Sequence, residues 1–181
     1  MSNKREGRKA IEKLYERFEF RYIRPEEADQ AARIEQVCFP PNEACTEKMM
    51  KDRAAAVSEL FLVAVDRQNG QLGGFLCGLA TDESRFRDEF FYDNTLHRPQ
   101  GKNVILLGLD VLPEYRGQGL ARELMHVYLQ REKERGRKMA VLTCLEDKIP
   151  MYEKMGFTNH GLSQSTWGGV PWYEMSCALD I

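Results

Sequence analysis

The sequence predicts an α/β fold in one domain, because segments with the period of strands alternate along the chain with segments that have the period of helices. The length of 181 residues is typical of a single domain. Hydrophobic residues make up 43% of the chain and charged residues 30%, a balance that favours a folded core over disorder. A repeat array or a two-domain enzyme is disfavoured on the same grounds.

The balance of charge argues against a surface built for nucleic acid. The chain has 26 Lys and Arg residues against 28 Asp and Glu residues, a formal net charge of -2. No apolar run approaches the roughly 18 residues of a membrane span, and the segment from Met1 to Lys13 is charged. We therefore expect a cytoplasmic protein that binds neither nucleic acid nor a membrane.

Cysteine and histidine are too scattered to predict a metal site. The five cysteines are at positions 38, 45, 77, 144 and 177 and include no C-x-x-C spacing. The three histidines are also far apart in the sequence. We expect packed, reduced thiols, no disulfide framework and no metal.

The N-terminal part of the chain predicts a helix, a strand and two further helices. Residues 4–17 combine many charges with a thin apolar stripe, typical of a solvated helix, and residues 19–24 alternate at period two, typical of a strand. Pro25 opens a helix that the Pro-Pro pair at 40–41 ends, and Thr46 starts another that runs to about Val57. The apolar face of the helix after Pro25 is predicted to hold Ala28, Ala31, Ile34 and Val37.

The middle of the chain predicts a hairpin. Residues 60–66 and 72–80 are apolar runs rich in strand formers, and Asn69-Gly70 between them is a strong turn signal. Residues 81–102 are polar around a cluster of aromatic residues. We expect one short helix and a loop in that stretch.

The C-terminal part continues the alternation. Residues 104–112 form a continuous apolar run, typical of a buried strand, and the apolar period from Gln118 to the stop signal at Gly136 is helical. Residues 139–145 predict another buried strand and residues 148–155 a short helix. A final pair of strands is expected to end at residues 173–179.

The loop from Pro113 to Ala121 has the clearest chemical signal, because it joins a buried strand to the start of a long helix. Several backbone N–H groups at a helix start lack acceptors inside the helix, and with the helix dipole they favour a phosphate or pyrophosphate. Gly117 and Gly119 would let the backbone approach such an anion closely. The spacing matches neither G-x-G-x-x-G nor a loop ending in Gly-Lys-Ser/Thr, and a ligand-free turn is the alternative.

The same loop resembles the shared motif of the GNAT N-acetyltransferases, Arg/Gln-x-x-Gly-x-Gly/Ala, which Arg116, Gly119 and Ala121 match. A second feature of that family, a Tyr in a short helix followed by a Gly-Phe strand start, is matched by residues 150–157. The resemblance covers roughly residues 19–180. It implies a GNAT fold, with helices flanking a central mixed, mostly antiparallel sheet. Residues 1–18 would then be an N-terminal helical extension and residues 19–181 the acetyltransferase domain.

Within that family the chain is most similar to the arylalkylamine (serotonin-type) N-acetyltransferases. The segments in register with that subgroup are Leu96-His97-Arg98-Pro99, Gly101, Pro150-x-Tyr152 and Glu174-Met175-x-Cys177. Those enzymes carry two histidines on the buried strand that relay the proton of the amine, whereas this sequence has Ile105 and Leu107 at the matching positions. The general base is therefore open, and the proton would leave through water or a distant carboxylate.

The resemblance implies acetyl-CoA as the co-substrate, held in a gap between two diverging strands. The backbone of Leu109, Asp110 and Val111 would bind the pantetheine arm. The pyrophosphate would lie on the loop and helix start, which comprise Arg116, Gly117, Gln118, Gly119, Leu120, Ala121 and Arg122. The amine would attack the thioester directly in a ternary complex.

Tyr152 is the candidate general acid, because a phenol with a pKa of about 10 can protonate the departing sulfur. A packed tyrosine on a short helix is the alternative. Strand alternation would place the Asp110 side chain on the face opposite Ile105 and Leu107, away from the amine. We therefore expect the Asp110 carboxylate to lie at the surface or one step removed from the substrate.

Phe39 and Trp172 are the candidate residues for binding the acceptor, at positions where the resemblance implies aromatic contacts with the substrate. Core packing is the alternative for both, and Trp167 is expected near the same mouth. Three carboxylates are weighed as partners of an ammonium or as a remote base, with a solvated surface charge favoured for each: Glu43, Glu83 and Glu89.

The sequence thus predicts an acetyl-CoA-dependent N-acetyltransferase that modifies a primary amine of a small molecule. Two alternatives stay open: a CoA-binding regulatory module that has lost turnover, and an acetyltransferase that acts on a peptide or protein amine. The identity of the amine and the oligomeric state also stay open, with a homodimer as one outcome.

Overall fold

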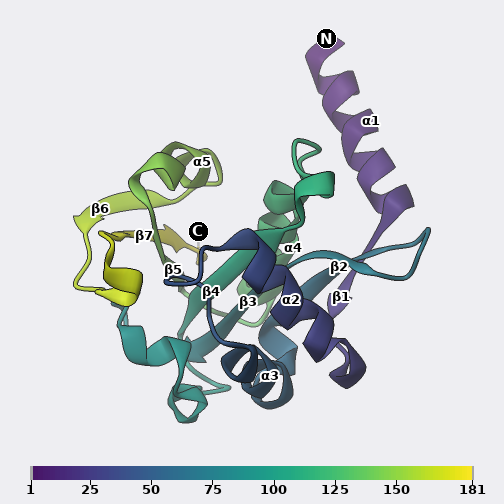
Figure 1. Ribbon diagram of the computed structural model, residues 1–181. Helices are drawn as coiled ribbons and strands as arrows, with labels where there is room; N and C mark the ends of the chain where they lie inside the picture. Colours follow the sequence, from purple (N-terminus) through teal and green to yellow (C-terminus); the bar gives the residue numbers. More distant parts are fainter. Residues whose placement is uncertain (1, 181) are drawn as a thin grey trace.

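The sheet has seven strands in the order β1-β2-β3-β4-β5-β7-β6 in the computed structural model, which describes residues 2–180 (Figure 1). The strands are β1 (Phe18–Tyr22), β2 (Phe61–Asp66), β3 (Leu72–Thr81), β4 (Asn103–Val111), β5 (Met139–Cys144), β6 (Thr158–Leu162) and β7 (Tyr173–Ala178). All neighbouring strands pair antiparallel except β4 and β5, which pair in parallel. The sheet is therefore mixed and mostly antiparallel, which confirms the predicted architecture.

Helices cover both faces of this sheet (Figure 1). α2 (Ala28–Cys38) and α3 (Glu47–Ala56) lie on one face, where Arg53 of α3 donates to the Sγ atom of Cys77 in β3 at 3.4 Å. α4 (Leu120–Glu134) lies on the other face, because a Cβ added at Gly78, the next residue of β3, would come within 2.9 Å of the Tyr128 hydroxyl. α5 (Ile149–Lys154) follows β5 and packs beside β6.

α1 (Ser2–Arg17) projects from the body of the molecule and is fixed to it through its last turns (Figure 1). The Tyr15 hydroxyl donates to Glu123 Oε1 of α4 at 2.6 Å. Arg17 donates two hydrogen bonds of 2.7 Å to the two carboxylate oxygens of Asp66, at the end of β2. β1 begins at the next residue, so the helical extension and the sheet adjoin without a linker.

Two local expectations need correction. Residues 81–102 contain two short 3-10 turns, Asp88–Phe91 and Asn94–Leu96, where one short helix was expected. Val37 is 58% exposed, so the prediction that it faces the core is wrong. Residues three apart fall about 60° short of a full helical turn at each step, and three such steps carry Val37 to the side opposite Ala28. Glu35, at 3% exposure, lies on the buried face instead.

β4 contains a β-bulge. Gly78 of β3 pairs with Leu106, but its neighbour Cys77 pairs with Gly108, so Leu107 is an extra residue on β4. An extra residue reverses the alternation of side chains for the rest of the strand. The bulge therefore decides which side chains of β4 face α2 and α3.

The bulge overturns the expectation for Asp110. Ile105 pairs with Leu79 and Asp110 pairs with Phe75, and three residues of β3 separate these two partners. Leu79, Cys77 and Phe75 alternate regularly, so they share one face of the sheet with their partners. Asp110 thus lies on the same face as Ile105, toward α2 and α3, and is 1% exposed instead of at the surface.

β4 and β5 separate soon after they begin. Their parallel pairing is confined to residues 103–105 of β4 and 139–141 of β5. Beyond these residues the neighbouring edges of the two strands no longer bond to each other, which leaves a gap where the resemblance implied one. Within residues 2–180, no helix combines the length and apolarity needed to cross a membrane. Met1 and Ile181, the ends of the two predicted segments, lie outside the described residues.

Candidate functional site

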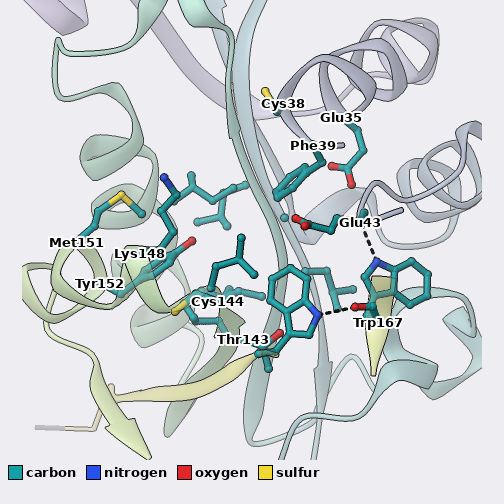
Figure 2. Close-up of a pocket in the computed structure, with 18 of the residues that line it drawn as sticks. Glu35, Cys38, Phe39, Glu43, Thr143, Cys144, Lys148, Met151, Tyr152 and Trp167 are labelled. Carbon is teal, nitrogen blue, oxygen red and sulfur yellow. Dashed lines mark hydrogen bonds between the residues drawn. The ribbon is translucent and has the colours of Figure 1, made fainter. Parts of the chain in front are cut away.

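A cavity of about 320 Å³ lies where β4 and β5 separate, which is a typical size for a small-molecule site. Its wall is formed by α2 and the following loop on one side and by β5 and α5 on the other (Figure 2). The lining residues that carry the argument below are Glu35, Phe39, Glu43, Gly108, Tyr152 and Trp172. The cavity therefore brings together segments from both ends of the chain.

Tyr152 lines the cavity from α5, opposite Glu35 and Glu43 (Figure 2). Its ring packs edge-on against Phe157 with the ring centres 5.9 Å apart, which fixes its orientation. Burial, helped by the nearby Cys144 and Asp110, raises the pKa of the Tyr152 phenol above its ordinary value. The phenol thus keeps its proton at neutral pH and can donate it to a developing anion.

Cys144 at the end of β5 lines the same wall as Tyr152. It is 3% exposed, and its Sγ lies 3.5 Å from the Met175 Sδ. Burial raises the pKa of this thiol to about 11. Cys144 is therefore a neutral packing group at physiological pH, in keeping with the prediction of packed, reduced thiols; all five cysteines are free.

Aromatic rings form one wall of the cavity. Phe39, Trp167 and Trp172 all line the cavity. Trp172 donates from Nε1 to the Trp167 carbonyl at 2.7 Å, and Trp167 donates from Nε1 to the Glu43 carbonyl at 2.7 Å (Figure 2). The Trp167 ring also packs against Phe91, with centres 4.5 Å apart. Phe39 and Trp172 are thus placed at the cavity, as is Trp167, which the sequence indicated near this mouth.

Three acidic residues line the cavity, Glu35 and Glu43 on the side of α2 (Figure 2) and Asp147 before α5. The other two acidic residues weighed from the sequence lie elsewhere, where Glu83 pairs with Arg87 at 2.6 Å and Glu89 lies 3.9 Å from the same guanidinium. Glu35 was not among the sequence candidates. The signal that could have found it is a charged residue one helical turn after Ala31, on the core-facing side of α2.

The loop before α4 has the backbone conformation that glycine permits. Gly117 has a φ of 76° and Gly119, the N-cap of α4, a φ of 86°, both in the left-handed region. Arg116 donates from Nε to the Val111 carbonyl at 2.8 Å, so its side chain ties the loop to the end of β4. The first turn of α4, with its unpaired N–H groups, therefore follows closely on the end of β4, where β4 and β5 have separated.

Only one of the three residues predicted to hold the pantetheine arm lines the cavity. Leu109 lines the cavity, whereas Asp110 and Val111 are buried and do not. Because β5 no longer pairs with β4 beyond Ile105, backbone groups on that edge of β4 before Val111 make no bond to β5 and can bond to a ligand in the gap. Among residues 2–180, no cluster of three or more His, Cys, Asp or Glu side chains is arranged to hold a metal ion.

Comparison with known proteins gives a consistent picture. The family model described as "Acetyltransferase (GNAT) family" matches residues 28–157. The serotonin N-acetyltransferase of Mesocricetus auratus is 34% identical over 113 residues, which cover 62% of this chain and 53% of that protein. The serotonin N-acetyltransferase of Pan troglodytes is 30% identical over 165 residues, 89% of this chain and 77% of that protein. The first of these alignments spans about half of the relative's length.

The fold is also similar to that of solved structures. The structure described as "GphF GNAT-like decarboxylase in complex with isobutyryl-CoA" superimposes with a TM-score of 0.74 over 89% of this chain and 99% of that one. The two sequences are 18% identical, so the similarity concerns the fold alone.

Proposed function

Since the chain belongs to the acetyltransferase (GNAT) family, we propose that it transfers an acetyl group from acetyl-CoA to the primary amine of a small molecule. The observation that carries this proposal is the cavity at the split between β4 and β5. One wall offers the Tyr152 phenol, and the opposite wall offers aromatic rings and two carboxylates. Such a cavity suits a thioester on one side and an aromatic ammonium on the other.

The residues around the gap fit acetyl-CoA as a substrate. The unpaired edge of β4 offers backbone groups to the pantetheine arm, and the first turn of α4 offers N–H groups to the pyrophosphate. The left-handed glycines, Gly117 and Gly119, leave no Cβ between these N–H groups and an anion. The solved structure that holds isobutyryl-CoA has the same fold, which supports this placement.

The chemistry we propose is direct attack in a ternary complex. The nitrogen lone pair of the uncharged amine forms a bond to the thioester carbonyl carbon, and the C–S bond then breaks. The departing sulfur takes the hydroxyl proton of Tyr152, and the new amide returns one N–H proton to the Tyr152 oxygen. Tyr152 fits this role because it lines the cavity and stays protonated at neutral pH.

The lining favours an aromatic or hydrophobic amine. The rings of Phe39, Trp167 and Trp172 offer apolar contact surface. Glu43 offers a carboxylate, while its backbone carbonyl accepts the bond from Trp167. A flexible polyamine would leave these rings against a polar chain and place further charges among apolar side chains. We therefore propose an arylalkylamine-like acceptor.

A second candidate function is a CoA-binding module without turnover. The observation that favours it is the absence of histidine on β4, where Ile105 is fully buried and Leu107 offers only an apolar contact to the cavity. This candidate shares the CoA site with the first and differs in having no acceptor.

Release of free thiol from acetyl-CoA in the presence of an amine panel separates these functions. The panel contains 2-phenylethylamine and tryptamine, spermidine, and peptides with free N-terminal or lysine amines. We expect thiol release with the aromatic amines and much slower release with spermidine and the peptides. Release with peptides alone would contradict the small-molecule assignment, and binding of acetyl-CoA without release for any amine would favour the non-catalytic module.

A further inference from the structure

Two buried carboxyl groups, Glu35 of α2 and Asp110 of β4, lie beside each other next to the cavity. We propose that this pair accepts the proton that the amine loses before it attacks the acetyl carbonyl, with Glu35 as the group that contacts the amine and Asp110 as a positioning residue. The inference rests on the proposed function. It names the base that Ile105 and Leu107 cannot supply.

The bulge at Leu107 is what brings Asp110 to this place. Gly108, directly after the bulge, lines the cavity and has no side chain to fill the space above Asp110. A Cβ added at Gly108 would lie 3.3 Å from Asp110 Oδ1 and 3.6 Å from the Cys77 Sγ. Asp110 therefore lies immediately behind the cavity wall, while Glu35 forms part of the wall itself.

Asp110 has no hydrogen-bond partner that would explain its burial. It is 1% exposed, and neither of its carboxylate oxygens has a partner among the described residues. Buried polar groups are normally hydrogen-bonded, so an unpartnered carboxyl group in this position calls for a functional explanation. Glu35 is held on one side only, because its Oε1 accepts the backbone N–H of Cys45 at 2.8 Å.

Two adjacent carboxyl groups in a buried site cannot both ionise at low cost, so the pair holds one proton and one negative charge near neutral pH. Burial and then the neighbouring Glu35 raise the pKa of Asp110 well above its ordinary value. The other titratable or charged side chains next to the pair are Cys38 of α2, Cys45 in the loop after α2, Arg53 of α3, Cys77 of β3 and Tyr152 of α5. The cavity that Glu35 lines also has Glu43, Cys144, Asp147 and Lys148 in its wall.

Arg53 supplies the positive charge of this buried layer. It is 1% exposed, donates to the Phe91 carbonyl at 2.8 Å, and contacts the sulfur atoms of Cys45 and Cys77 at 3.8 and 3.4 Å. These two thiols are also neighbours of Glu35 and Asp110, so the guanidinium is buried near the pair, where a positive charge favours one negative charge. The pair can therefore stay singly ionised inside the protein and act as a base.

The proton step balances without any further reactant. The ammonium nitrogen gives one proton to the ionised carboxyl group of the pair and keeps the N–H bonding electrons as its lone pair. The pair then carries two protons and no charge, and the uncharged amine attacks the thioester. After the acetylated product leaves, the pair returns one proton to water.

The wild-type protein gives the first test, through the pH dependence of kcat. The probes are 2-phenylethylamine and its β,β-difluoro analogue, whose amine is much less basic. If the pair is the base, kcat levels off at the same pH for both amines, because the titrating group belongs to the protein. If the proton leaves directly to water, the plateau moves to lower pH with the less basic amine, and the proposal is wrong.

Three variants then identify the group whose titration sets the pH at which kcat levels off. Glu35→Gln keeps the acceptor for the Cys45 N–H and should lower kcat about 10²- to 10⁴-fold, with a residual rate whose plateau moves to lower pH for the less basic amine. Asp110→Asn removes the second carboxyl group, with which Glu35 shares one proton and one negative charge, and should shift the plateau to higher pH by about 1 unit. The matched control, Glu43→Gln, removes a cavity carboxylate that is outside the pair and should raise the KM for the amine without moving the plateau.

The acetyl-CoA affinity of all three variants, measured by calorimetry, should be unchanged. An unchanged affinity shows that the variant is folded. A Glu35→Gln variant that binds acetyl-CoA and keeps most of its kcat would overturn the proton-acceptor role while leaving the proposed function intact. If the wild-type protein acetylates no amine, the proposed function fails, and this inference fails with it.

Discussion

Trp172 donates a 2.7 Å hydrogen bond from its indole Nε1 to the carbonyl oxygen of Trp167, and this bond fixes two aromatic rings in the wall of one cavity. The bond joins the residue before β7 to the 3-10 turn Trp167–Gly169, so this wall of the cavity is shaped by the last part of the chain. A hydrogen-bonded indole presents a rigid apolar face at little cost in side-chain entropy.

Trp172→Ala should raise the KM for an aromatic amine tenfold or more, equivalent to about 1.4 kcal/mol, because the substrate loses its ring contact. The Kd for acetyl-CoA should change much less, since the loop before α4 is not involved. Trp172→Phe is the matched control: it keeps an apolar ring and loses only the bond to Trp167. Steady-state kinetics decide between them, and equal losses in KM for both substrates of the Ala variant would argue for general unfolding of the site.

Tyr152→Phe should lower kcat about 10²- to 10⁴-fold with little change in acetyl-CoA affinity, because the ring packing against Phe157 survives and only the hydroxyl is lost. Burial raises the pKa of Tyr152, so the wild-type enzyme should keep its acid in the protonated form beyond the ordinary phenol value of about 10. A pH–rate profile of kcat checks both points. A Phe variant that keeps most of its kcat, with chemistry rate-limiting, would assign Tyr152 to packing.

Gly119→Ala should weaken acetyl-CoA binding tenfold or more, about 1.4 kcal/mol, by placing a methyl group beside the first N–H groups of α4. The protein itself has room for that methyl group, because its nearest neighbour would be an Arg122 nitrogen at 3.6 Å. The cost of a left-handed conformation must still be separated from the loss of binding.

Gly70→Ala is the control that separates the cost of the left-handed conformation from the loss of acetyl-CoA binding. Gly70 has a φ of 70° in the β2–β3 turn, and no atom lies within 4 Å of an added Cβ. Both variants should therefore lower the Tm by similar amounts, while only Gly119→Ala loses affinity in calorimetry. Equal acetyl-CoA binding by the two variants would exclude the loop as the pyrophosphate site.

Asp66 should make the attachment of α1 sensitive to acid. The Arg17 guanidinium, and after it the Tyr115 hydroxyl at 2.7 Å, hold the pKa of Asp66 well below its ordinary value. A lowered folded-state pKa contributes stability that is present above the unfolded pKa of about 4 and is lost as pH falls below it. Asp66→Asn should therefore lower the Tm by a few degrees at pH 7, and the difference from wild type should shrink at pH 3.

Asp52→Asn is the control for that experiment, because Asp52 forms an exposed ion pair with Lys48 and should change the Tm little at either pH. Thermal unfolding followed by circular dichroism measures all three proteins. A difference between Asp66→Asn and wild type that persists unchanged at pH 3 would show that packing, and not the carboxylate charge, sets the stability of this corner.

Local sequence signals were sufficient for the elements of the site that depend on short segments. The glycines of the loop before α4 and the short helix that carries Tyr152 are each defined by neighbouring residues, and the structure shows the loop directly before α4 and Tyr152 in the wall of the cavity. The alternation of apolar periods likewise predicted the strands and the main helices.

Features that depend on partners distant in sequence could not be predicted in this way. The bulge at Leu107 arises from the pairing of β3 with β4, and it reverses the face on which Asp110 lies. The burial of Glu35 depends on which side of α2 faces the sheet. The prediction from sequence used a spacing of three residues for that side, and it therefore placed Val37 on the wrong face. The carboxyl pair therefore emerges only from the folded chain.

The decisive measurement is the identification of both products in one reaction of the wild-type protein with acetyl-CoA and 2-phenylethylamine. Free thiol and N-acetylated amine, quantified by absorbance and mass spectrometry, should form in equal amounts and at a rate that depends on the protein. Free thiol without acetylated amine, or no consumption of acetyl-CoA with any amine while the protein still binds it, would contradict acetyl transfer to a small-molecule amine.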